Sequence, residues 1–252
     1  DKGNRWIASL GRENGHLHPL FIPTPSLDAE TLADKIKEGR FLGLKPYAAL
    51  NQAVDYAEAR IEEFLPRHQM EVVDELGLIV VLHIVRSGRV GHPVNIRDLV
   101  RLCGDHPDAR IILAHVGRSY GPYFIEQALP RLKELPNLYY DVAALDDTET
   151  IEVLLEEVPH RRVLYGTDLP ITLLRGRHLC VNRHCFFLTE KPCPNSVTPR
   201  EDQEFPMTFM VYETIRAVIR ACRKKGLGPD ALEDIFYNNA ATLVRETERN
   251  LP

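Results

Sequence analysis

The chain has 252 residues, of which 44% are hydrophobic, enough for one large α/β domain with a substantial core. Its net charge of −5 argues against a protein that binds the nucleic-acid backbone, because such proteins usually carry a basic patch. No apolar run approaches the ~18 residues of a membrane span, no signal peptide is visible, and the five cysteines lack paired spacing. We therefore expect a cytoplasmic protein without a disulfide framework and without nucleic-acid or membrane partners.

Apolar runs of strand length recur along the chain, and each is followed by a helix-like segment. Repeated β-then-α order implies right-handed crossovers and a parallel sheet, either a closed barrel or an open doubly wound sheet. No GxGxxG or phosphate-loop pattern follows any run, which removes the commonest support for a nucleotide-binding open sheet. The expected strands are, in chain order, 18–23, 41–48, 78–84, 110–116, 138–144 and 162–168.

Amphipathic stretches between these runs predict the helices. Ser26 is a plausible N-cap of the first helix, and Pro66 interrupts the second. Residues 171–205 show no clear periodicity and are expected to form a long loop, and residues 207–252 to form helices that close a single domain over 1–252. The expected helices are 27–39, 51–76, 95–103, 122–135, 148–158, 207–224 and 229–247.

Polar residues stand late in four of the expected strands, at Lys45, His83, His115 and Asp168. In a parallel barrel these carboxyl ends share one face, which is the catalytic face. Two imidazoles and a carboxylate are ordinary ligands of a divalent metal, which activates water and polarises carbonyl oxygens. Each residue also has a structural interpretation, since a strand-end histidine is often only hydrogen-bonded and TDLP is turn-like. Their shared position favours a site.

The motifs resemble those of the amidohydrolase-related family that includes aminocarboxymuconate semialdehyde decarboxylase and related decarboxylases and lactonases. GLKPY is similar to its fourth strand, LIVVLHI to its fifth, ILAHVG to its sixth, YGTDLP to its eighth and IFYNNAATLV to its C-terminal helix. The resemblance implies a (β/α)₈ TIM barrel and a hydrolase or non-oxidative decarboxylase that acts on a small carboxylated or carbonyl compound. It also implies a divalent metal, zinc or manganese, with His83 and Asp168 as ligands and His115 and Asp168 as catalytic residues.

One part of the family pattern has no counterpart here. The family's first strand ends in His-x-His, whereas the run 18–23 corresponds to the third strand, so strands 1 and 2 are expected to be missing from this sequence. His16-Leu17-His18 precedes that run, and we expect it on the stability face of the barrel. Either residues precede Asp1 in the full protein or this member has lost the pair. The second case leaves an alternative, a metal-free barrel that binds a small molecule or acts as a scaffold.

Several further side chains are candidates for contact with a substrate. Arg86 and Arg118 follow two of the strand-end histidines, and arginine forks bind carboxylates bidentately, although both could be solvated loop charges. Tyr47 and Tyr120 could line the pocket, and Lys45 is assigned to substrate contact or structure. We therefore expect a small-molecule substrate as the partner and leave a homo-oligomer open.

The sequence leaves two points undecided, the orientation of Asp141 and the role of the segment 178–193. Asp141 lies at or near the end of the strand expected within 138–144, and its side chain could face the site or face outward. The segment 178–193 carries zinc-capable side chains, but no CxxC pair, so we expect it to shape the pocket or an interface. These side chains are His178, Cys180, His184, Cys185 and Cys193.

Overall fold

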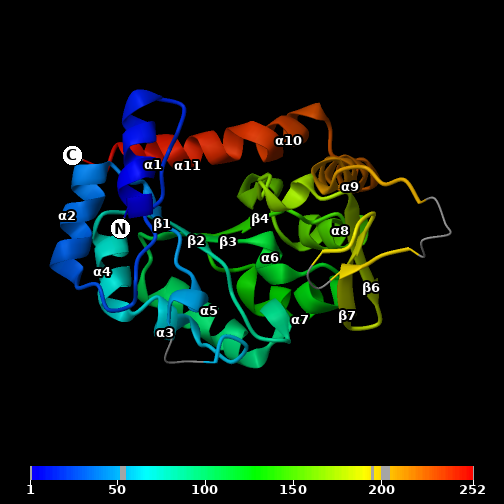
Figure 1. Ribbon diagram of the computed structural model, residues 1–252, viewed down its shortest axis with the longest axis horizontal. Helices are drawn as coiled ribbons and strands as arrows, with labels where there is room; N and C mark the ends of the chain where they lie inside the picture. Colours follow the sequence, from blue (N-terminus) through cyan, green and yellow to red (C-terminus); the bar gives the residue numbers. More distant parts are fainter. Residues whose placement is uncertain (1, 52–54, 194–195, 200–204, 252) are drawn as a thin grey trace.

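The computed structural model describes residues 2–51, 55–193, 196–199 and 205–251. A parallel five-stranded sheet forms its centre, with strand order β1-β2-β3-β4-β5 (Figure 1). An isolated parallel bridge between Phe21 and Leu44 adds a sixth strand position. The order follows the chain without the reversal of a doubly wound sheet, as in a barrel. The strands are β1 (Gly43–Leu44), β2 (Ile79–Leu82), β3 (Arg110–Leu113), β4 (Leu138–Asp141) and β5 (Val163–Leu164).

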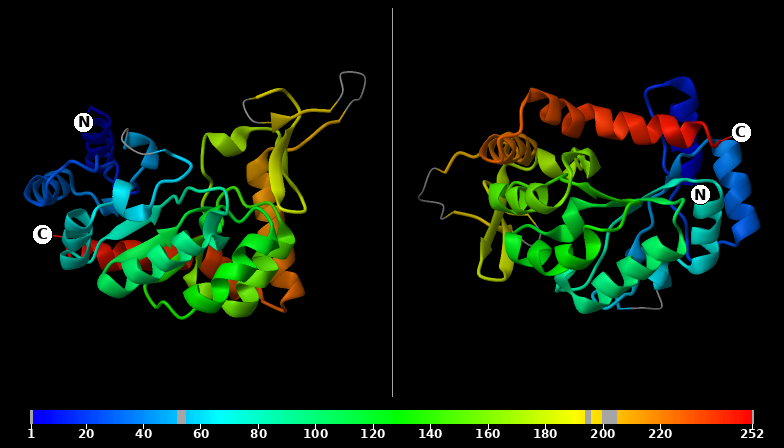
Figure 2. Two further views of the ribbon diagram at one scale, coloured as in Figure 1. Left: turned by 90° about the horizontal axis from the view of Figure 1, so that it is seen from below. Right: turned by 180° about the vertical axis from the view of Figure 1, so that it is seen from behind.

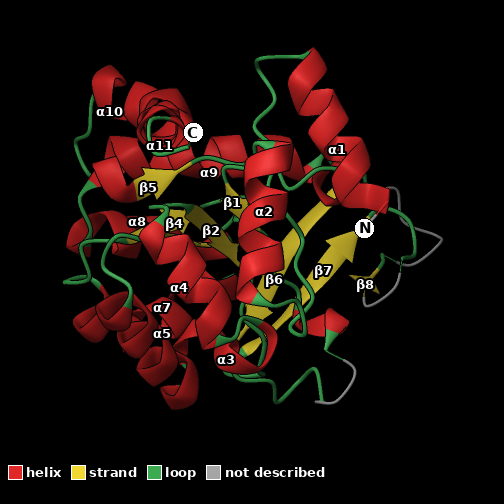
Figure 3. Ribbon diagram, turned by 90° about the vertical axis from the view of Figure 1, so that its left-hand side faces the viewer, coloured by secondary structure: helices red, strands yellow, loops and turns green. Residues whose placement is uncertain are grey.

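The crossover helices pack on one face of this sheet, which we call the outer face. Alternate strand residues such as Val80, Ile111 and Tyr140 point into this layer and are fully buried. Figure 3 shows the sheet between this layer and the C-terminal helix α11 (Asn239–Glu248). The crossover helices are α2 (Ala29–Gly39), α4 (Arg67–Glu75), α5 (Pro93–Asp105), α7 (Pro122–Leu132) and α8 (Thr148–Glu157).

The opposite, inner face packs on α11. Leu243 of α11 contacts a small cluster formed by Ile79, Ile112 and Leu164, which alternate with the outward-facing residues. The end of α11 lies beneath the amino ends of the strands, where Glu248 Oε1 is 3.3 Å from His18 Nδ1. His18 therefore lies on the stability side of the sheet, as expected, and away from the strand ends that carry the candidate site.

Three expectations about helices need correction or qualification. Asp28, rather than Ser26, caps α2, because its Oδ1 accepts a hydrogen bond from the Thr31 amide at 2.9 Å. The stretch 51–76 is not helical throughout. Pro66 does separate α3 (Ile61–Phe64) from α4, but residues 55–60 are not helical and include a turn at 56–58, and 52–54 lie outside the described residues. The remaining predicted helices are present with slightly different ends, and α1 (Lys2–Glu13) is additional.

The expectation of a long loop over 171–205 was wrong where the chain is described. A second, three-stranded sheet stands there, formed by β6 (Gly176–Val181), β7 (His184–Thr189) and β8 (Ser196–Val197), while 194–195 and 200–204 lie outside the described residues. Figure 2 shows it at the end of the molecule away from both termini. Polar and charged residues in the strands obscured their two-residue alternation.

The C-terminal segment follows the prediction closely. Helix α9 (Met210–Lys224) packs against α8, and α10 (Pro229–Glu233) leads through a π-helical turn, η5 (Asp234–Asn238), into α11. Over the described ranges, none of the helices combines the length and the apolar character needed to cross a bilayer.

Candidate active site

The strand-end residues converge at the carboxyl edge of the sheet. His83 follows β2, His115 follows β3 and Asp168 follows β5, so the parallel strands bring three distant segments to one place. The rings of His83 and His115 lie 5.6 Å apart between centroids and nearly perpendicular, and His115 Nε2 is 3.9 Å from Asp168 Oδ2. The structure therefore brings together the three residues that the sequence singled out.

The orientation of His115 is fixed by the loop that follows β4. His115 Nδ1 lies 2.8 Å from the Ala143 carbonyl oxygen, which can only accept a hydrogen bond. Nδ1 therefore carries the proton in the neutral ring, and Nε2 presents its lone pair toward Asp168. The Ala143 amide in turn donates to Asp141 Oδ1 at 2.5 Å, so Asp141 anchors the backbone of the residue whose carbonyl orients His115.

The backbone at the site adopts a left-handed conformation that side chains other than glycine rarely take. His115, Val116 and Arg118 have φ angles of 54°, 49° and 63°, and Asp168 has 52°. Such residues cost of order 1–3 kcal/mol each and persist where the surroundings enforce them. At Gly117, which has φ 65°, a Cβ atom would stand 2.6 Å from Val90 Cβ, so this turn also needs close contact. Strained residues gathered at the carboxyl edge of the sheet are consistent with a functional site there.

His83 and Lys45 both lie among charged side chains at the site. Burial, together with repulsion from Arg118, Lys45 and a protonated His115, lowers the pKa of His83 to about 3, so the ring is neutral near pH 7. Burial also lowers the pKa of Lys45, whereas Asp141 and Asp168 raise it. Lys45 therefore interacts with His83 and with two carboxylates, whereas Arg118 acts on His83.

Asp141 belongs to this site, which resolves the orientation that the sequence left open. Burial raises its pKa, while His115 and Lys45 lower it. The signal that could have found it is the two-residue alternation of β4, because Tyr139 packs with the inner-face cluster and residue 141 must share its face.

The predicted substrate contacts take different positions. Tyr47 is 41% exposed, and Lys45 Nζ lies 5.7 Å from its ring centroid. Arg118 has no ion pair or side-chain hydrogen bond within the described ranges, although its charge reaches His83. Arg86 is already paired, since its Nη1 lies 2.5 Å from Glu58 Oε2 and its other terminal nitrogen donates to the Glu58 carbonyl. Arg118 is therefore the freer carboxylate ligand.

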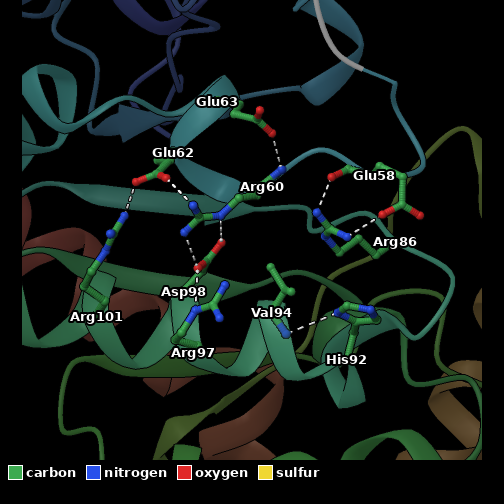
Figure 4. Close-up of polar contacts among 10 residues, drawn as sticks. All are labelled: Glu58, Arg60, Glu62, Glu63, Arg86, His92, Val94, Arg97, Asp98 and Arg101. Atoms are coloured by element: carbon green, nitrogen blue, oxygen red, sulfur yellow. Dashed lines mark hydrogen bonds and ion pairs between the residues drawn. The ribbon is translucent and has the colours of Figure 1, made fainter.

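Glu58 begins a segment that is held to α5 by charged contacts (Figure 4). Arg60 donates from Nε and Nη2 to the two carboxylate oxygens of Asp98, at 3.2 and 2.8 Å, and Asp98 has only 4% of its side chain exposed. Arg60 also contacts Glu62 at 2.7 Å. This buried pair fixes the chain between β1 and α4, and Arg86 ties the same chain to the end of β2.

The second sheet supplies part of the wall of the site, which the sequence did not reveal. Tyr120 lies 6.4 Å from His115 and stacks on His178 of β6 at 3.8 Å between centroids. Two residues further along β6, Cys180 forms a disulfide with Cys185 of β7, contrary to the expectation drawn from the cysteine spacing. The other cysteines, Cys103, Cys193 and Cys222, are free.

The donor set is only partly suited to a metal. His83, His115 and Asp168 have the right ligand chemistry for zinc or manganese. Within the described residues, however, no group of three or more His, Cys, Asp or Glu side chains lies close enough to hold a metal ion. These residues alone therefore do not form a complete metal site.

A family profile described as amidohydrolase matches residues 4–245. The chain belongs to the amidohydrolase family. A search of curated proteins finds no match. The match covers nearly the whole chain, and it agrees with the motifs at the carboxyl ends of β1, β2, β3 and β5.

Solved structures with the same fold include decarboxylases. The dihydroxybenzoic acid decarboxylase of a Polaromonas species, with bound manganese and 2-nitroresorcinol, is 18% identical, with 97% of this chain and 74% of that chain covered and a TM-score of 0.55. A 5-carboxyvanillate decarboxylase of Novosphingobium aromaticivorans, with bound manganese, is 12% identical, with 97% and 70% covered and a TM-score of 0.59. A TIM-barrel protein of Bordetella bronchiseptica is 15% identical, with 97% and 72% covered and a TM-score of 0.51. The TIM-barrel class is confirmed, and the six strand positions are part of it.

Proposed function

We propose that this amidohydrolase-family chain is a hydrolase or non-oxidative decarboxylase that acts on a small aromatic carboxylate. The observation that carries the proposal is the pair formed by His115 and Asp168, with Nε2 of a buried imidazole directed at a carboxylate 3.9 Å away. Two of the solved structures named above are a dihydroxybenzoic acid decarboxylase and a 5-carboxyvanillate decarboxylase, which supports the substrate class.

The side chains divide into a binding group and a proton-moving group. Lys45 and Arg118 would bind the substrate carboxylate, because both are cationic and Arg118 has no competing ion pair in the described part of the chain. In hydrolysis, Nε2 of neutral His115 would accept a proton from the attacking water; in decarboxylation, Nε2 would first take a proton from solvent and then donate it to the carbon whose bond to the departing carbon dioxide breaks. Asp168 faces the same nitrogen and would stabilise the imidazolium that forms.

A divalent metal, zinc or manganese, is part of the proposal as a cofactor of the complete site. His83 and Asp168 would serve as two of its ligands, as neutral imidazole and carboxylate. Because the described residues provide too few donors for a closed site, we derive no catalytic step through the metal. The same shortage supports a second candidate function, a metal-free barrel that binds a small carboxylate without turning it over.

The test measures carbon dioxide release and hydrolysis products from a panel of hydroxylated benzoates, with zinc, manganese or no added metal. Asp168→Asn should lower turnover by about 10²–10⁴-fold, whereas Asp34→Asn, at an exposed position on α2, should leave it unchanged. Normal turnover by the Asp168 variant would overturn the assignment. Tight binding of a benzoate without turnover under any metal condition would instead favour the binding protein.

A further inference from the structure

A column of aromatic rings leads from the candidate active site into the second sheet. Tyr120 lies between His115, at 6.4 Å, and His178, at 3.8 Å with an interplanar angle of 9°. His178 in turn contacts Phe187, its cross-strand partner in β7, at 4.3 Å. The sheet formed by β6 and β7 is therefore in direct contact with the side chain that borders His115.

His178 and Asp146 form a buried polar pair behind Tyr120. Their side chains are 2% and 1% exposed, and His178 Nδ1 lies 3.5 Å from Asp146 Oδ2. The same oxygen accepts the His178 backbone amide at 2.7 Å. Among the described residues, neither ring nitrogen of His178 nor Asp146 Oδ1 has a hydrogen-bond partner.

The two ring nitrogens of His178, buried without hydrogen-bond partners among the described residues, destabilise the fold in a way that an apolar ring would not. A buried polar group without a hydrogen-bond partner costs about 1–3 kcal/mol, and phenylalanine would stack on Tyr120 without it. Packing alone therefore does not explain an imidazole at position 178. The carboxylate of Asp146, 3.5 Å from Nδ1, indicates that the ring pairs with a charge.

Asp146 links this pair to His115 through the chain itself. The segment that follows β4 contains both Ala143, whose carbonyl oxygen lies 2.8 Å from His115 Nδ1, and Asp146, which contacts His178. His115 and His178 are therefore connected in two ways, through the segment 143–146 and through the ring of Tyr120. A shift of His178 would be transmitted to His115 by both connections.

We propose that His178 is a positioning residue which, paired with Asp146, holds Tyr120 and the segment 143–146 so that His115 Nε2 faces Asp168. This role rests on the proposed function for its catalytic meaning, although the orientation of His115 exists without it. Arg89 supports Tyr120 independently, since its guanidinium lies 5.0 Å from the Tyr120 ring centroid and Nη1 donates to the Arg118 carbonyl at 3.0 Å. Tyr120 and the strained turn at 115–118 thus form one unit that β6 holds in place.

The experiment measures the tautomer of His115 by nitrogen-15 NMR of the full chain labelled at histidine, with resonances assigned by His115→Gln. The wild-type protein should show a proton on Nδ1 alone. His178→Phe keeps a stacked ring but removes the nitrogens, and Asp146→Asn removes the charge. Each should produce a mixture of tautomers, while His184→Phe, on the exposed side of the same hairpin, should not.

These outcomes separate the positioning role from the activity. If a benzoate substrate is found, either variant should lower kcat by about 10–100-fold with KM nearly unchanged, as expected for a misplaced catalytic group. An unchanged His115 tautomer in a folded His178→Phe or Asp146→Asn protein would overturn the inference, whether or not a substrate is known. A changed tautomer without any turnover supports the positioning role and counts only against the proposed activity.

Discussion

His83 should make the stability of this protein depend on pH. Its pKa is lowered to about 3 in the folded chain, mainly by burial, against 6.5 for an unperturbed histidine. The folded pKa lies below the unfolded one, so the unfolded chain binds the proton first and protonation favours unfolding. The contribution of His83 is therefore present above pH 6.5 and is lost as the pH falls from 6.5 toward 3.

The size of the effect follows from the two pKa values. At pH 5 the unfolded histidine is almost fully protonated and the folded one is not, which lowers the free energy of unfolding by about 2 kcal/mol relative to pH 7. The assay is urea unfolding of the wild-type protein and His83→Asn at pH 5, 6 and 7. The difference between the two proteins isolates His83 from the other titrating groups.

The wild-type protein and His83→Asn should differ in how their free energies of unfolding depend on pH. The wild-type protein should lose about 2 kcal/mol more than His83→Asn between pH 7 and pH 5. His16→Asn, at an exposed position before the first strand segment, should follow the wild-type curve. Parallel pH dependence in the wild-type protein and His83→Asn would refute the burial of a neutral imidazole at this site.

Two further substitutions test the binding group and the anchor beside it. Arg118→Gln should raise the KM for a benzoate about tenfold with little change in the free energy of unfolding, because its guanidinium has no ion pair in the described ranges; steady-state kinetics and urea unfolding measure both. Arg60→Ala should lower the free energy of unfolding by about 3 kcal/mol, because it removes the bidentate partner of the buried Asp98 carboxylate and leaves Arg97, at 3.7 Å, as its ion pair among the described residues. Arg67→Ala, which breaks an exposed pair with Glu71, should cost less than about 1 kcal/mol in the same assay.

The order of strands and the position of the site could be predicted because both depend on local patterns. An uninterrupted apolar run such as 78–84 indicates a buried parallel strand, and a polar residue late in that run must lie at the carboxyl edge. His83, His115 and Asp168 were found in this way. Their roles as ligands or catalytic groups stay predictions, as do the single-domain organisation, the cytoplasmic location and the oligomeric state.

The parts that could not be predicted depend on tertiary contacts. Arg86 and Arg118 each follow a strand-end histidine, so the sequence does not distinguish them. Only the fold shows that Arg86 already forms an ion pair with Glu58. The second sheet could not be predicted because its strands carry Arg177, His178 and the two disulfide cysteines among apolar residues. Short strands with mixed polarity resemble a loop until their cross-strand partners are known.

The charges around His83 support the proposal that the substrate is an anion. Lys45 and Arg118 both lower the pKa of His83, so two cationic side chains act on this ring. Asp141 and Asp168 lie within reach of Lys45, but no ion pair neutralises Arg118 in the described part of the chain. A substrate carboxylate bound between the two cations would supply the missing negative charge close to His115. Under this proposal, charge complementarity at Lys45 and Arg118 would favour a carboxylate over a neutral compound of the same shape.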